Sequence, residues 1–279
     1  MTDGVLRYVT ASTSVYCMLT LTSAKNPVLK EIRKAVLRGS LTDGGLCVAE
    51  SFHLLEEALR SDCEIDSVFA TESVKSAVEA HVRGLKSIRV MVLADDLFRS
   101  IAATEHSQGV IALVRPPQWN LDQLFRGLAL VVVLDGVQDP GTAGTIVRAA
   151  EAFGASGVAF LKGTVDPFNP KTVRASAGSV FRVPMVASLD ERLLLAAIEQ
   201  RKIDMYAMAP AGILPLESCR MARKCVLVIG SEGHGVSMHL RSKSIDVRIP
   251  TVGVESLNAA MAAAVALYEA RRQRMAAEA

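Results

Sequence analysis

Residues 249–272 read IPTVGVESLNAAMAAAVALYEARR, and this stretch sets the organisation of the second half of the chain. It begins as the end of a strand, turns at Gly253 and enters an alanine-rich helix. Ser256 is the predicted N-cap of that helix, because its hydroxyl can accept a backbone N–H group that the first turn leaves unpaired. The residues at helical spacing that we expect in the core are Leu257, Ala260, Met261, Ala264, Val265 and Tyr268.

The polar residues at the start of this helix allow two interpretations. Glu255, Ser256 and Asn258 lie where the N–H groups of the first turn converge, which favours a site for a small polar ligand. A plain C-terminal helix with an ordinary cap accounts for the same residues. The stretch alone leaves both interpretations open.

Composition predicts a globular protein with no metal site and no membrane segment. Of the 279 residues, 50% are hydrophobic and 22% are charged, which suffices for a full core and for two domains. The net charge of +2 and the pI of about 8.3 are too mild to indicate a nucleic-acid partner by themselves. The five cysteines are scattered without a C-x-x-C pair, which argues against zinc and against a disulfide framework. Because no apolar run reaches membrane-spanning length and no signal-peptide pattern is present, we expect a cytoplasmic protein.

The first half of the chain predicts a small α/β domain between two irregular segments. Residues 1–24 are rich in Thr and Ser with weak periodicity, so we expect an irregular lead-in. Strands then alternate with short helices through residues 25–115, which indicates a layered sheet. The prolines in residues 116–127 interrupt this pattern and predict a linker.

The helix predicted over residues 25–38 is basic. Its candidates for contact with a phosphate backbone are Lys30, Arg33 and Lys34. A solvated surface face explains these cations equally well.

Residues 128–279 predict an open, mostly parallel sheet with helices on both faces. The run Leu128–Leu134 is continuously apolar, as in a strand buried on both sides. Three segments, 131–148, 226–237 and 249–272, share one pattern, in which a buried strand leads through a glycine-containing loop into a helix. If these strands are parallel neighbours, their loops form one pocket beyond the carboxyl ends of the strands. The spacing Gly230-x-x-Gly-x-Gly235 is wrong for a dinucleotide fingerprint, and the P-loop sequence is absent.

Together the three loops resemble the motifs of the SpoU (TrmH-like) family of RNA ribose 2′-O-methyltransferases in the SPOUT superfamily. The first motif is DPGTAGTIVRAA at 139–150, the second is GSEGHGVS at 230–237, and the third joins Ile249-Pro250 to ESLN at 255–258. NPKTVRASAG at 169–178 and FRVP at 181–184 also fit the family pattern. The resemblance covers residues 128–274, and residues 25–115 resemble more weakly the family's accessory RNA-binding domain.

The resemblance implies a fold, a cofactor and a partner. It implies a deep C-terminal trefoil knot, in which the last strand and helix pass through an earlier loop; sequence rules alone would not propose this. It implies S-adenosylmethionine bound in the knot, a homodimer that completes each site, and an RNA substrate, with no DNA expected. The residues placed at the cofactor by this resemblance are Gly230, Ile249 and Leu257.

The resemblance also implies roles in transfer of a methyl group to a ribose 2′-oxygen. By motif position Arg148 handles the hydroxyl, and because a guanidinium stays protonated we expect it to stabilise the developing alkoxide. Glu232 orients Arg148 or the target nucleotide, although an ordinary solvated turn acid explains it as well. Ser256 and Asn258 hold the cofactor or the ribose. The candidates for RNA phosphate contacts in this half are Lys171 and Arg174, with plain surface charge as the alternative.

One residue departs from the family pattern, and it keeps alternatives open. Thr142 stands where the first motif usually has Asn, so an amide group is missing. The leading hypothesis is an enzyme that methylates ribosomal RNA, with transfer RNA as the nearest alternative substrate. A knotted RNA-binding protein without activity is the alternative from another class, and intact Arg148, Glu232, Ser256 and Asn258 argue against it. A nucleotide-binding regulatory domain is disfavoured by the missing phosphate loop.

Overall fold

The structure, a computed structural model, describes residues 6–7, 17–83 and 88–278. The chain divides into two compact units, each with its own sheet. The N-terminal unit is Met1–Pro117 with Phe168–Phe181, and the C-terminal unit is Gln118–Pro167 with Arg182–Ala279. Within the described residues, no helix combines the length and the apolar character needed to cross a membrane.

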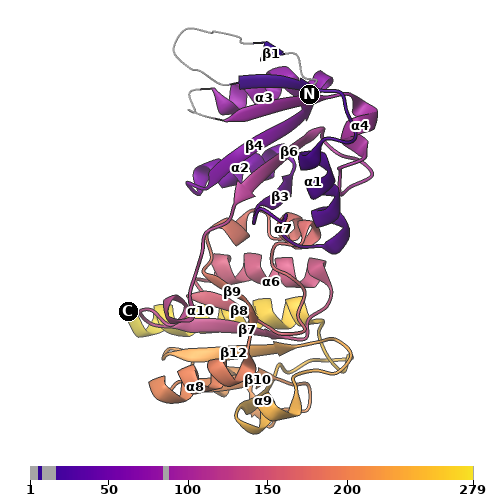
Figure 1. Cartoon of the computed structure of the whole chain (residues 1–279). Helices are drawn as coiled ribbons and strands as arrows, with labels where there is room; N and C mark the ends of the chain where they lie inside the picture. Colours follow the sequence, from indigo (N-terminus) through magenta and orange to yellow (C-terminus); the bar gives the residue numbers. More distant parts are fainter. Residues whose placement is uncertain (1–5, 8–16, 84–87, 279) are drawn as a thin grey trace. The chain divides into compact units, whose positions relative to one another are not determined.

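The N-terminal unit is built on a mixed six-stranded sheet with the strand order β1-β2-β5-β4-β6-β3 (Figure 1). Its strands are β1 (Leu6–Arg7), β2 (Cys17–Leu21), β3 (Cys47–Glu50), β4 (Glu64–Thr71), β5 (Arg89–Leu93) and β6 (Val110–Arg115). Its helices are α1 (Pro27–Arg38), α2 (Phe52–Arg60), α3 (Lys75–Val82), α4 (Asp95–Arg99) and α7 (Pro170–Ala175). The alternation of strands and helices predicted for residues 25–115 is therefore present.

The expectation of an irregular lead-in is wrong for residues 17–21. These residues form β2, which pairs in parallel with β5, and Met18 is buried. The pairing partner lies far along the chain, so local periodicity carries no sign of it. Residues 1–5 and 8–16 of the predicted lead-in lie outside the described residues.

A segment from the second half of the chain completes the N-terminal unit. α7 packs against β3, and Pro170, Thr172 and Val173 are buried there. The side chain of Asn169, which caps α7, lies against Gly39, the residue that ends α1. Along the sequence, the chain therefore passes through β8 of the C-terminal unit and then returns to the N-terminal unit.

The C-terminal unit is built on a parallel seven-stranded sheet with the strand order β11-β13-β10-β12-β7-β8-β9. Its strands are β7 (Leu130–Asp135), β8 (Gly157–Leu161), β9 (Met185–Leu189), β10 (Asp204–Met208), β11 (Leu214–Pro215), β12 (Cys225–Gly230) and β13 (Ile245–Arg248). Its helices are α5 (Leu121–Leu124), α6 (Pro140–Ala152), α8 (Glu191–Arg201), α9 (Met238–Ser242) and α10 (Ala259–Glu278).

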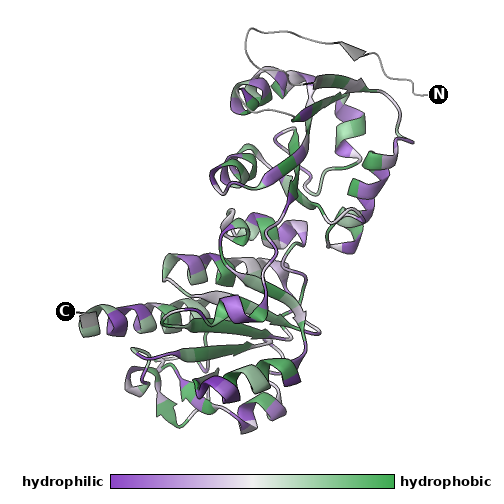
Figure 2. Cartoon of the chain, turned by 60° about the vertical axis from the view of Figure 1, so that its left-hand side comes forward, coloured by the Kyte–Doolittle hydropathy of each residue, from purple (hydrophilic) through white to green (hydrophobic). Residues whose placement is uncertain are grey.

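Helices cover both faces of this sheet, as predicted. α6 and α10 lie on one face, and α8 and α9 lie on the other (Figure 1). Val131 and Val133 of β7 belong to the core cluster that contains Leu194 of α8 and Leu240 of α9. All residues of β7 up to Leu134 are fully buried, which explains the continuous apolar run and the uniformly hydrophobic central strands in Figure 2.

α10 begins two residues later than the predicted cap implies. Asn258, rather than Ser256, caps the helix, because its Oδ1 accepts a hydrogen bond from the backbone N–H of Met261 at 2.8 Å. The prediction for Ser256 as the N-cap is wrong. Asn and Ser are similarly good caps, so the local sequence did not distinguish them.

The core face of α10 is also different from the predicted one. The side chains that are fully buried include Ala263, Ala266, Leu267 and Ala270, and α10 packs closely on α6. The stripe of larger apolar residues faces outward, with exposed fractions of 55% for Met261, 39% for Val265 and 57% for Tyr268. Small residues allow two helices to approach closely, so the alanines take the core positions that we expected the larger residues to occupy.

Arg274 holds the end of α10 in place. Arg274 is buried, with a relative exposure of 7%. Its guanidinium donates to four backbone carbonyls, those of Met221, Leu128, Ala129 and Arg223, at distances from 2.7 to 3.0 Å. A buried charge is tolerated when its hydrogen bonds are made, and this one joins α10 to the start of β7 and to the loop before β12.

We expect Arg274→Ala to lower the free energy of unfolding of the C-terminal unit by about 3 kcal/mol, because four buried carbonyls lose a charged donor. Urea unfolding followed by circular dichroism measures this change. Arg272→Ala is the matched control, since Arg272 is exposed on the same helix and, among the described residues, pairs only with Glu269. We expect a change below about 0.5 kcal/mol. Equal effects of the two substitutions would contradict this role of Arg274.

Candidate active site

Four parallel strands of the C-terminal unit end at one edge of the sheet, and their loops meet there. In spatial order these strands are β13, β10, β12 and β7. From β7 the chain continues to β8 on one side, while β12 lies on the other side, so the strand order reverses between β7 and β12. Ligands in open α/β sheets bind at such a reversal, beyond the carboxyl ends of the strands.

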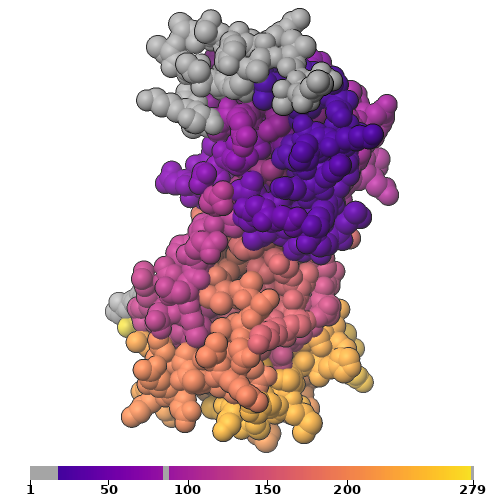
Figure 3. Space-filling view, in the orientation of Figure 1, coloured from indigo at the N-terminus to yellow at the C-terminus, as the bar shows by residue number. Residues whose placement is uncertain are grey.

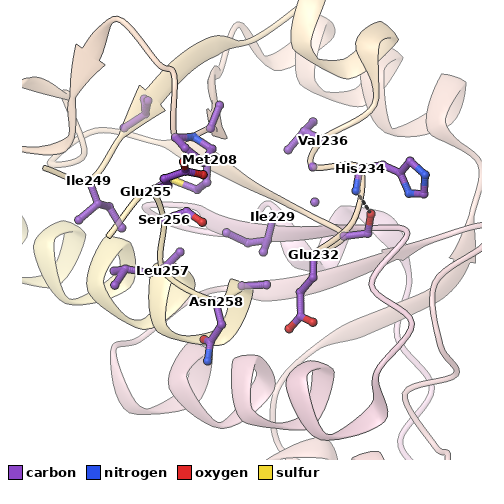
Figure 4. A pocket seen from close by; sticks show the side chains of 18 of the residues that line it. Met208, Ile229, Glu232, His234, Val236, Ile249, Glu255, Ser256, Leu257 and Asn258 are labelled. Carbon is purple, nitrogen blue, oxygen red and sulfur yellow. Dashed lines mark hydrogen bonds between the residues drawn. The ribbon is translucent and has the colours of Figure 1, made fainter. Parts of the chain in front are cut away.

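The first pocket at this edge has a volume of about 500 Å³. Its apolar wall consists of Ile229, Val236, Ile249 and Leu257, and Figure 4 shows these side chains around the cavity. The predicted cofactor residues Gly230, Ile249 and Leu257 all line it. This volume and this lining, with polar groups at a few positions, are typical of a site for a small organic molecule.

The sequence analysis missed one wall of the first pocket. Met208, Ala209 and Pro210, from the loop after β10, also line it. The signal was a buried strand followed by Pro210 and Gly212, which is the same pattern as in the three loops that were recognised.

The loop after β12 is held in a tight turn by its own backbone. Ser231 and Gly235 exchange two backbone hydrogen bonds, and the Ser231 hydroxyl accepts a bond from the N–H of His234. Gly230 passes so close to this turn that a Cβ atom there would lie 2.0 Å from the carbonyl carbon of Gly235. A glycine at position 230 is therefore required by the close approach of the two backbone segments.

The polar candidates of the third motif lie in the loop that leads into α10. Glu255, Ser256 and Asn258 line the first pocket and are exposed. Figure 4 shows Glu232 and Asn258 pointing to the same side of the site, from two different loops. The Asn258 carbonyl oxygen is used in the helix cap, which leaves its amide N–H groups available to a ligand.

A second pocket, of about 610 Å³, adjoins the first. It lies between the loop after β7 and the loop after β12, and both pockets share Ser231, Glu232, His234 and Gly235. The carboxylate of Asp135, at the end of β7, accepts a bond from the N–H of Ser237 at 2.7 Å. This bond ties the two loops together. The sequence analysis did not single out Asp135 or Ser237, although Asp135 directly follows a buried strand.

Thr142 lies in the wall of the second pocket. Its hydroxyl is 3.5 Å from Oε1 of Glu232, and its backbone N–H bonds to the Asp139 side chain at 2.6 Å. Thr142 therefore keeps a polar contact with the loop after β12 even without the amide of the usual Asn.

Arg148 and the basic candidates lie elsewhere. Arg148 is exposed on α6, lines neither pocket, and has no hydrogen bond or ion pair with any described residue. Lys171 and Arg174 are exposed on α7. Because α7 is part of the N-terminal unit, they belong to the same unit as Lys30, Arg33 and Lys34 on α1. Arg33 donates to the carbonyl of Ala24 and to the Ser100 hydroxyl, and Lys34 pairs with Asp43.

Comparison with known proteins identifies related families over both halves of the chain. The model described as SpoU rRNA Methylase family matches residues 129–268, and the model described as MRM3-like substrate binding domain matches residues 26–112. The chain is 30% identical to the 23S rRNA guanosine 2′-O-methyltransferase RlmP of Bacillus subtilis, over 91% of this chain and 100% of that one. It is 32% identical to the 23S rRNA guanosine-2′-O-methyltransferase RlmB of Ralstonia nicotianae, over 80% of this chain and 94% of that one.

A solved structure has the same fold. It is the SpoU methyltransferase AviRb of Streptomyces viridochromogenes in complex with the cofactor AdoMet, which is S-adenosylmethionine. The TM-score is 0.80 at 27% identity, over 90% of this chain and 99% of that one.

We expect Gly230→Ala to weaken binding of S-adenosylmethionine at least about 10-fold, because the added methyl group displaces the turn that forms one wall of the first pocket. Isothermal titration calorimetry measures this affinity. Gly233→Ala is the matched control in the same loop, since a Cβ there meets no atom within 4 Å, and its affinity should change less than about 2-fold. Unchanged binding by a folded Gly230→Ala protein would place the cofactor elsewhere.

Proposed function

The chain belongs to the SpoU rRNA methylase family, and from this premise we propose that it transfers the methyl group of S-adenosylmethionine to a ribose 2′-hydroxyl in ribosomal RNA. The observation that carries the proposal is the pair of adjoining pockets at the carboxyl edge of the parallel sheet. Methyl transfer requires a donor and an acceptor side by side, and two pockets that share a wall provide this arrangement. We propose a cytoplasmic location, which action on ribosomal RNA supports.

The first pocket suits S-adenosylmethionine. Gly230, Ile249 and Leu257 hold the adenosine through backbone groups and apolar contact, in a cavity with apolar walls and a few polar groups. When bound, the cofactor supplies a methyl group on a positively charged sulfur. Among the residues that line the two pockets the one Lys or Arg is Arg241, which pairs with Asp246, and the glycine loops lack the P-loop lysine, so a nucleoside triphosphate fits poorly.

The protein's own residues prepare the ribose hydroxyl. As the O–H bond breaks, negative charge develops on the 2′-oxygen, and the proton leaves to a nearby base or water. The oxygen then bonds to the methyl carbon while the bond from that carbon to sulfur breaks, which leaves a neutral thioether. The Arg148 guanidinium stays protonated and stabilises that charge. Glu232 faces the shared wall of the two pockets and orients the nucleotide or Arg148, while Ser256 and Asn258 offer polar groups to the cofactor or the ribose.

We expect Arg148→Ala to lower the rate of methyl transfer at least about 100-fold while leaving the affinity for S-adenosylmethionine unchanged, because Arg148 lies outside the first pocket. Transfer of tritium from labelled cofactor to separate pools of ribosomal and transfer RNA measures the rate and identifies the substrate. Arg192→Ala, at an exposed arginine on α8, is the control. Label in transfer RNA alone would refute the choice of substrate, and full activity of Arg148→Ala would refute the role of Arg148.

We propose further that the protein works as a homodimer through α10. The exposed residues Met261, Val265 and Tyr268 follow one another at intervals of four and three residues, and Met275 lies two turns further on, so all four lie on one face of the helix. Tyr268 also meets Phe153 of α6 edge to face, which extends this surface toward the helix that carries Arg148. Large contiguous apolar surface is typical of an interface between proteins. A second copy seated here explains how Arg148, which lines neither pocket of its own chain, comes to act in a site.

We expect Tyr268→Glu to convert the dimer into a monomer and to abolish methyl transfer, because it places a charge within an apolar interface. Size-exclusion chromatography with light scattering measures the mass. Leu193→Glu is the matched control, since Leu193 is an equally exposed apolar residue on α8, across the sheet. A wild-type protein that stays monomeric at micromolar concentration would contradict the proposal.

The N-terminal unit carries a basic surface for RNA on two of its helices. α1 has four cations and one acid, and segment 168–181 adds Lys171 and Arg174 with no acid. By contrast, α2 and α4 each carry more acids than Lys and Arg residues. Asn169 touches Gly39, so the end of α1 and the start of α7 form one continuous surface, and the indigo residues that include α1 make much of the surface of this unit in Figure 3. Cations segregated in this way suit a phosphate backbone.

The deep C-terminal knot is part of the same proposal. The chain leaves β12, forms α9, and reaches β13, which is separated from β12 by β10. It then returns over the carboxyl ends of β10 and β12 to α10, on the opposite face from α9. This return path supports a threaded chain of the kind found in this family.

A further inference from the structure

The second pocket differs in chemistry from a phosphate site. None of its twelve lining residues is Lys or Arg. It is lined instead by the carboxylates of Asp135, Asp139 and Glu232, which accept hydrogen bonds, and by the hydroxyls of Thr142, Ser231 and Ser237. Gln138 and His234 also line the pocket, so donors are present as well, but the carboxylates favour a part of the RNA substrate that presents hydrogen-bond donors rather than negative charge.

The floor and the rim of this pocket are distinct. At the floor, Asp135 and Ser237 are partly buried and Val137 is buried, with a relative exposure of 3%. At the rim, Asp139 and Glu232 are exposed. The Ser237 hydroxyl oxygen is buried and has no hydrogen-bond partner among the described residues. A buried hydroxyl without a partner is costly, so a ligand group or a water molecule that reaches the floor of the pocket would be stabilised by bonding to it.

One oxygen of Asp135 is already engaged. Its Oδ2 accepts the N–H of Ser237, and no hydrogen bond to Oδ1 is found within the described part of the chain. The carboxylate is thus held in a fixed orientation by one bond and retains acceptor capacity for a ligand.

We propose that the second pocket receives the base of the target nucleotide and that Asp135 makes it selective for guanine. Guanine alone presents two adjacent donors, N1–H and the N2 amino group, on its Watson–Crick edge, and a carboxylate accepts both together. Adenine and cytosine present one donor beside an acceptor, which a carboxylate repels, and uracil presents a donor between two acceptors. The Ser237 hydroxyl supplies the further partner at the floor. A base turned out of its stack in this way is a common mode of RNA recognition.

This inference rests on the proposed function, because it concerns the acceptor side of the same reaction. The positions of the two adjoining pockets support the inference. The shared residues Ser231 and Glu232 place the base beside the cofactor pocket, so the ribose attached to that base lies near the boundary between the two cavities. Thr142 and Glu232 then face the ribose from the rim.

The first test identifies the product. Unmethylated ribosomal RNA is incubated with the wild-type protein and S-adenosylmethionine, digested to nucleosides and analysed by mass spectrometry. We expect 2′-O-methylguanosine. Formation of 2′-O-methyluridine, -cytidine or -adenosine instead would overturn the guanine assignment while leaving the methyltransferase function intact. Absence of every methylated nucleoside, with cofactor bound, would overturn the proposed function itself.

The second test assigns the selectivity to Asp135. Asp135→Asn keeps an oxygen for the Ser237 N–H but replaces the other carboxylate oxygen with a donor. We expect kcat/KM on an RNA fragment that carries the mapped target to fall about 10- to 100-fold. Replacing the target guanosine with inosine, which lacks the N2 amino group, should lower wild-type kcat/KM but scarcely affect Asp135→Asn.

The control distinguishes base reading from other roles of the carboxylate. Asp190 also accepts a backbone N–H, that of Arg192 at the start of α8, so Asp190→Asn is a matched change away from the pockets. It should leave kcat/KM unchanged. If Asp135→Asn weakens binding of S-adenosylmethionine in calorimetry, or responds to inosine as the wild type does, Asp135 serves the cofactor or the loop and the inference is wrong.

Discussion

The site depends on the parallel pairing of β7 with β12. Their register places Gly230 opposite Asp135, at the last residue of each strand. This pairing therefore sets which loops face each other. The bond from the Ser237 N–H to Asp135 then closes the two loops over the strand ends.

The last helix has two tasks that require different faces. Its small residues pack on α6, and Arg274 anchors its end through four backbone carbonyls near β7 and β12. Its larger apolar residues remain exposed, which is unfavourable for an isolated chain and favourable for a chain that associates. Anchoring and the association that we propose thereby use different faces of one helix. The loop that precedes the helix lines the first pocket, so the position of α10 affects the shape of the proposed cofactor site.

The segment 168–181 links the two functions of the protein along the chain. It follows β8 of the catalytic sheet, yet α7 is buried against β3 of the N-terminal unit. Its cations add to those of α1 on the same unit. The surface proposed for RNA is thus built from two segments that lie far apart in the sequence, and a fragment that ends at Pro117 would lack one of them.

The sequence determined much of the local structure. The continuous apolar run at Leu128–Leu134 predicted a buried strand, and β7 is that strand. Gly230 was singled out from its loop pattern, and the structure explains it by the close approach of Gly235. These features depend on short-range periodicity and steric limits, which a sequence displays directly.

Tertiary structure decided what depends on partners far along the chain. β2 exists because it pairs with β5, and the core face of α10 is the alanine face because α6 lies against it. The choice of Asn258 over Ser256 as the cap, and the meeting of Asp135 with Ser237 in one pocket, likewise follow from the path of the backbone. Local sequence shows that a residue is apolar or can form a hydrogen bond, but only packing decides which neighbour it meets.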